Sequence, residues 1–222
     1  MDFEFLFKPV EDVDAWLAGL FAGAPLLVAL GIAFVLGLRH ASDPDHLVAV
    51  TSLVATQGGD VRGATILGAT WGLGHAGTLL GVGLPLIALK GELPAWLERG
   101  AEAAVGAVIV LLAARLVYRW RRPGNTLRVR SRRQAFAIGV LHGLAGTGAV
   151  VVLLIAAMPG RLEAAAALAV FAPVSMLSMA MCTSAFAWTL SRRAIAPLYR
   201  VVLLPGLGVF GVLFGVWYAG LT

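Results

Sequence analysis

Two histidines and two aspartates lie within seven residues of an otherwise apolar stretch. His40 and His46 enclose Asp43 and Asp45, and Pro44 separates the two acids. On a helix, residues three apart share a face, so His40, Asp43 and His46 would point the same way. Imidazole binds nickel, cobalt, zinc and copper, and carboxylates add charge and harder oxygen ligands. Because ionisable groups in hydrocarbon are costly and usually functional, this run predicts a site for a divalent transition-metal cation.

The other two of the four histidines also lie in apolar segments. Helical rise places His40, His75 and His142 about 8, 15 and 12 Å from the inner membrane face, so all three can reach one polar layer. We expect His75 to be a metal ligand and His142 to line the cavity or a second site; a hydrogen-bonded core histidine is the alternative for each. Arg39 adjoins the run, where it either pairs with one of the aspartates in the absence of metal or extends to the inner interface.

A softer group of side chains lies further along the chain. Ser175, Met176, Met179 and Cys182 could line the same cavity or form a second site. Thioethers select Cu(I), so a copper pathway is one interpretation. Methionine is also a flexible filler of apolar cores, and we favour that interpretation.

The composition identifies the class of protein. Hydrophobic residues make up 59% of the 222 residues and charged residues 13%, with a mean hydropathy of +0.88. Soluble domains average about 45–50% apolar and about 25% charged, so we expect an all-α, multi-pass membrane protein. The net charge of +5 fits a topology signal and contact with anionic lipid rather than nucleic acid. The single cysteine excludes an internal disulfide and a CxxC motif.

Six apolar stretches divide the chain. They cover residues 16–56, 65–89, 101–119, 134–158, 164–190 and 197–219. The first would reach about 60 Å as one helix, twice the hydrocarbon thickness. Because Pro44 lies inside it, we predict a spanning helix up to about His40, a break at 43–45 and a shorter helical piece. Before it, Phe3, Phe5, Leu6 and Phe7 predict a short interfacial segment.

Basic loops indicate the orientation. Seven arginines and no acid occupy 119–133, and three arginines and no acid occupy 192–200. Cytoplasmic loops carry such an excess, so we expect an inner-membrane protein with both termini outside and the 119–133 loop in the cytoplasm.

The chain also matches itself. Phe34, Gly37 and His40 recur 102 residues later as Phe136, Gly139 and His142. With three spans in each half, the copies would run in opposite directions, which is a recurring transporter plan. We therefore predict a single transmembrane domain over 1–222, with halves of about 16–119 and 134–219 joined by a basic loop over 120–133.

Three segments together resemble one known family. The run from His40 to His46 is similar to the H-x4-D-H motif of the nickel/cobalt transporter family, with Pro44 where that family usually has alanine. Leu73-Gly74-His75-Ala76 resembles its Leu-Gly-His-Ser box, and 141–146 is similar to the His-Gly-Leu-Ala-Gly stretch of its shorter, urease-associated permeases. The resemblance implies a secondary permease of the lysine-exporter-like superfamily for Ni²⁺ or Co²⁺, with import and export both open.

The implied metal ligands are His40, Asp43, Asp45, His46 and His75. We accordingly expect a permease that rocks two halves around the cation, with no permanently bound cofactor and no enzymatic activity. Two alternatives stay open: a membrane enzyme whose bound metal activates water, and a membrane partner for metalloenzyme maturation. Homo-oligomerisation is also open.

Overall fold

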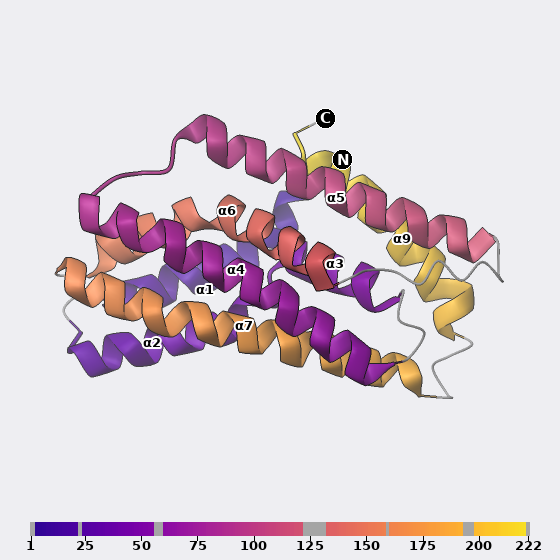
Figure 1. The fold of residues 1–222 in the computed structure, drawn as a ribbon, viewed down its shortest axis with the longest axis horizontal. Coiled ribbons are helices and arrows are strands. Elements are labelled where there is room, and N and C mark those ends of the chain that lie inside the picture. The colour runs from indigo at the N-terminus through magenta and orange to yellow at the C-terminus, as the bar shows by residue number, and fades with distance from the viewer. Residues whose placement is uncertain are drawn as a thin grey trace.

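The structure is a computed structural model, and it describes residues 3–21, 24–55, 60–121, 132–158, 160–192 and 198–220. All of its elements are helical, as the composition predicts (Figure 1). In chain order they are α1 (Glu4–Phe21), α2 (Leu26–His40), α3 (Pro44–Ala55), α4 (Val61–Leu89), α5 (Ala95–Arg121), α6 (Arg132–Ala157), α7 (Arg161–Ser191), the π-helical turn η1 (Tyr199–Leu203) and α9 (Leu204–Tyr218).

The long helices follow the apolar stretches of the sequence. Four segments of the described chain are long and apolar enough to cross a bilayer, and the bent pair α2–α3 makes a fifth if it counts as one span. The four are Val61–Leu89, Ala95–Tyr118, Arg161–Ser191 and Val201–Tyr218. Helix α6 occupies the range of the fourth expected stretch. The number of six spans stays a prediction.

Helices α4, α6 and α7 form the centre of the bundle (Figure 1). Helix α4 packs along both α6 and α7, α2 packs on the other side of α7, and α5 pairs with α9. A buried apolar cluster joins α2, α4, α6 and α7 around Leu79 and Leu168, both fully buried. A second cluster surrounds Trp71 and Met179. The polar residues of the site lie where these helices meet.

The break in the first stretch falls where proline predicts it. Helix α2 ends at His40, and α3 begins at Pro44 with a bend of 43° between them. Proline has no backbone N–H and tolerates the first turn of a helix, where that donor would be unpaired anyway. The Ser178 hydroxyl of α7 donates a hydrogen bond to the Leu38 carbonyl at this broken end. A neighbouring helix thus satisfies a backbone group that the break releases.

Glycines allow the central helices to approach closely. A Cβ on Gly139 of α6 would lie 1.9 Å from the Trp71 carbonyl oxygen of α4, and one on Gly37 of α2 would lie 2.8 Å from the Phe171 carbonyl oxygen of α7. Small residues at helix crossings are a recurring device of membrane bundles. Only glycine fits at these two crossings without a shift of backbone.

The amino-terminal segment differs from the short interfacial stretch that we expect. An 18-residue helix, α1, includes it and continues to Phe21. Phe3, just before the helix, is buried at 6% exposure and makes edge-to-face contacts with Phe210 and Phe214 of α9. Phe5 is exposed. The four apolar residues therefore do not form one membrane-facing patch, because Phe3 packs into the bundle.

Candidate metal centre

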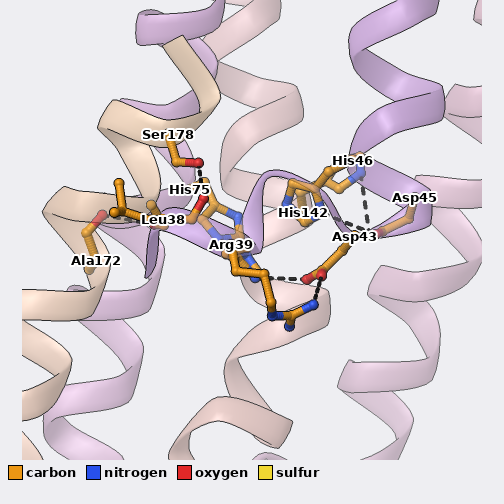
Figure 2. Close-up of polar contacts among 11 residues, drawn as sticks. Leu38, Arg39, Asp43, Asp45, His46, His75, His142, Ala172 and Ser178 are labelled. Atoms are coloured by element: carbon orange, nitrogen blue, oxygen red, sulfur yellow. Dashed lines mark hydrogen bonds and ion pairs between the residues drawn. The ribbon is translucent and has the colours of Figure 1, made fainter. Parts of the chain in front are cut away.

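The metal candidates of the sequence converge at the break between α2 and α3 (Figure 2). Potential ligand atoms of His40, His46 and His75 all lie within 4.8 Å of one another. His46 and His75 are buried, at 3% and 0% exposure, and His40 is partly buried. The break brings His46 back beside His40, with ring centroids 4.6 Å apart, and α4 supplies His75. A straight helix could not place two histidines six residues apart in ring contact with a third from a neighbouring helix.

Each aspartate supports the histidine next to it. Asp43 Oδ2 lies 2.9 Å from His40 Nδ1, and Asp45 Oδ1 lies 3.0 Å from His46 Nδ1. An ionised carboxylate only accepts hydrogen bonds, so each Nδ1 must carry the proton. In the neutral imidazole this leaves a lone pair on Nε2, the state that a metal requires.

The two Asp–His pairs therefore look like carboxylate–histidine–metal arrangements. The sequence predicts the aspartates as direct ligands, and in the structure one oxygen of each lies against the Nδ1 atom of a candidate histidine ligand. Their direct coordination stays a prediction. Arg39 Nη1 lies 3.2 Å from Asp43 Oδ1, which is one of the two pairings expected for this arginine.

A histidine–histidine hydrogen bond joins two members of the cluster. Nε2 of His40 lies 2.9 Å from Nε2 of His75. Because Asp43 holds the His40 proton on Nδ1, His75 must be the donor. Nε2 of His46 and Nδ1 of His75 make no hydrogen bond with the described residues, although both are buried. Buried polar atoms normally have partners, so these free nitrogens indicate a site built to receive a ligand.

His142 lies beside His46. Its ring centroid is 5.2 Å from that of His46, and its Nε2 lies 4.0 Å from Asp45 Oδ2. From the sequence, His142 is predicted only to line the cavity or to belong to a second site. The structure brings it into the same buried cluster, at 2% exposure.

Two aromatic residues complete the surroundings, and the sequence analysis does not select either of them. Trp71 lies 5.4 Å from His46 and 5.5 Å from His142 between ring centroids, and Phe171 lies 5.2 Å from His40. These rings exclude water and lower the local dielectric, which strengthens the charge interactions inside. Trp71 precedes His75 by one helical turn, so helical spacing could have placed it on the same face.

The softer group on α7 packs into the bundle. Met179 is fully buried in the apolar cluster that contains Trp71, and Cys182 packs against that cluster. Met176 packs against the other central cluster, and the buried Ser175 hydroxyl donates to the Ala172 carbonyl at 2.8 Å. No hydrogen bond or ion pair described for this part of the chain links these four residues to the histidines. Their packing favours the core-filler interpretation over a copper pathway.

The fold and the site define a class: a helical, multi-pass membrane protein with a buried histidine–aspartate cluster able to hold a divalent cation. Comparison with known proteins narrows that class. The chain is 28% identical to the urease accessory protein UreH of Bacillus sp. (strain TB-90), over 87% of this chain and 91% of that protein. It is 32% identical to a high-affinity nickel transport protein of Cupriavidus necator, over 56% of this chain and 36% of that protein.

A third relative is the hydrogenase nickel incorporation protein HupN of Bradyrhizobium diazoefficiens. It is 39% identical over 34% of this chain and 20% of its own length. No family profile and no solved structure matches the chain. The chain is thus similar in sequence to proteins named for urease accessory function, nickel transport and nickel incorporation, in line with the resemblance of its motifs.

Proposed function

We propose that this protein is a secondary permease for Ni²⁺, with Co²⁺ as a second substrate. The cation binds to His40, His46 and His75 and crosses the membrane by alternating access. The observation that carries the proposal is the set of three convergent histidines, two of them oriented by carboxylates, buried in an apolar helical bundle. The names of the relatives supply the choice of metal.

The closest pair of nitrogens is spaced as two ligands of one ion would be. Two nitrogen ligands about 2.05 Å from one ion are about 2.9 Å apart at a right angle and about 3.4 Å apart at the tetrahedral angle. The Nε2 atoms of His40 and His75 are 2.9 Å apart. Binding would then replace the histidine–histidine hydrogen bond with two metal bonds at nearly unchanged separation, once the proton on His75 Nε2 is released or His75 takes the tautomer protonated on Nδ1.

Alternating access would use two inverted halves, 16–119 and 134–219. Equivalent residues of the repeat make equivalent contacts: Gly37 packs on α7, the second helix of the other half, and Gly139 packs on α4, its counterpart. The Leu38 carbonyl accepts a hydrogen bond from Ser178 of α7, and the Val140 carbonyl, 102 residues later, accepts one from Thr78 of α4. This reciprocity supports a two-fold relation between the halves.

The halves differ at one point that matters for transport. The first copy of the repeat ends in the α2–α3 break, and the second copy runs on as the continuous helix α6. Broken helices at membrane depth line the ion sites of many transporters. We place the 119–133 loop in the cytoplasm and both termini outside, because arginine-rich loops stay on the cytoplasmic side.

The experiment that tests the function is nickel flux into vesicles that contain the purified chain. A permease moves Ni²⁺ down its gradient and releases it, and His75→Ala at equal protein content abolishes the flux. A membrane enzyme would instead keep its metal through purification and dialysis and show no flux.

The relatives named for urease and hydrogenase suggest where the metal goes. We propose that the cation carried by this chain supplies a nickel enzyme in the same cell. The chain should then raise the activity of a nickel enzyme at limiting external nickel. Metal that crosses only when a maturation protein is present would instead support the role of a membrane partner for that protein.

A further inference from the structure

The four histidines do not surround a single point. His46 is in ring contact with His40 and His75 at 4.6 and 5.3 Å, and with His142 at 5.2 Å. Trp71 lies against His46 and His142. His46 therefore contacts His142 in addition to its two partners in the three-histidine cluster.

A gap between two ligand atoms lies on the His142 side. Nε2 of His142 faces Asp45 Oδ2 at 4.0 Å, too far for a hydrogen bond. That nitrogen is buried and has no hydrogen-bond partner among the described residues. The other oxygen of Asp45 is already engaged by His46 Nδ1. A nitrogen and an oxygen that each bind a cation at about 2.0–2.2 Å can be about 4 Å apart when the ion lies between them.

We propose that Asp45 Oδ2 and His142 Nε2 form a second cation position, to which the ion passes from the cluster of His40, His46 and His75 during transport. The proposal rests on the function proposed above. Only two protein atoms define this position, so water completes the coordination and binding is weaker than in the three-histidine cluster.

The second position would link the two halves of the bundle. The three histidines of the first position come from α2, α3 and α4, all in the first half, whereas His142 comes from α6 in the second half. Asp45 belongs to both positions, since one oxygen orients His46 and the other faces His142. Movement of α6 relative to α3 would change the second position while leaving the first intact.

The test separates binding from transport. Co²⁺ binding to the purified full chain is followed by its visible absorption, and Ni²⁺ flux is measured in vesicles. The double variant His40→Ala/His75→Ala should weaken Co²⁺ binding at least about tenfold and leave a weak residual site, because it dismantles the three-histidine cluster while the second position survives. Adding His142→Ala to that variant should remove the residual site.

The single variant His142→Ala should bind Co²⁺ within about twofold of the unaltered chain but lose at least about tenfold in flux, a loss of the size seen when metal-site partners are removed. His142→Gln keeps a polar side chain of similar length. It would restore flux if His142 had only a structural role. Because glutamine does not replace the imidazole as a metal ligand, we expect flux to stay low.

Two results would overturn the second position. One is equal weakening of Co²⁺ binding by His142→Ala and His75→Ala, which would mean one four-histidine site. The other is residual binding in His40→Ala/His75→Ala that does not depend on His142. If the unaltered chain binds Co²⁺ but carries no Ni²⁺, the proposed function fails, and the binding of the triple variant with His142→Ala still decides whether the second position exists. If the unaltered chain binds no Co²⁺, both positions are refuted.

Discussion

Replacement of Gly139 by alanine should disrupt the metal centre without touching a ligand. Gly139 lies on α6 where this helix crosses α4, and an added Cβ would lie 1.9 Å from the Trp71 carbonyl oxygen and 3.0 Å from the His75 backbone nitrogen. These two atoms belong to the helical turn that presents His75. The methyl group would therefore press directly on the backbone that positions a predicted ligand.

The size of the effect follows from the contact distance. Because a Cβ is hardly ever closer than 3.0 Å to another heavy atom, α4 and α6 must separate by about 1 Å at this crossing. The atom met is a backbone oxygen, so no side-chain rotation can relieve the contact. Overpacking of this kind costs about 1–3 kcal/mol of stability. A displacement of about 1 Å in the groups of a site can reduce its activity about 100-fold.

Gly146 on the same helix provides the matched control. An added Cβ there meets nothing within 4 Å. The assay compares thermal unfolding in detergent, Ni²⁺ affinity and vesicle flux for Gly139→Ala and Gly146→Ala. We expect the first variant to lose stability, affinity and flux and the second to match the unaltered chain. Equal behaviour of the two variants would refute the helix crossing on which the site depends.

Three further predictions address the support of the site. Asp45→Asn should raise the Ni²⁺ dissociation constant about 10–100-fold by calorimetry, because His46 loses the carboxylate that holds its proton on Nδ1; unchanged affinity would contradict this role. Ser178→Ala removes the hydroxyl that satisfies the Leu38 carbonyl and should cost about 1 kcal/mol in detergent unfolding, whereas no loss would mean that the broken end needs no such partner. Phe3→Ala should destabilise the bundle by about 3–5 kcal/mol while Ni²⁺ affinity stays constant, and a parallel loss of affinity would show that α1 contributes to the site.

Much of the fold could be predicted from the sequence, because hydrocarbon imposes long apolar helices. The expected stretches 65–89 and 164–190 match α4 and α7 within a few residues. The break near Pro44 was also predictable, since proline removes a backbone donor and two aspartates flank it. By contrast, α1 was missed because its short apolar runs alternate with acids and do not have the length of a span.

The sequence selects the residues that gather at the candidate site, but not how their side chains are oriented toward one another. The residue types and their spacing in the sequence are enough to select His40 and His46. The bend of the chain, by contrast, decides that Asp43 and Asp45 face the Nδ1 atoms of these histidines rather than a common centre. The approach of His142 depends on how closely α6 packs on α4, which is a property of the assembled helices. Local sequence patterns carry no information on such distances between helices.

The most direct test of the account is Ni²⁺ flux into vesicles that contain the purified protein, with the unaltered chain and His46→Ala reconstituted in equal amounts. His46 is the histidine in ring contact with all three others. The account predicts metal entry with the unaltered chain and a loss of at least about 100-fold with the variant, since removal of a ligand should cost at least as much as removal of its supporting partner. Equal flux for the two proteins would contradict transport through this site.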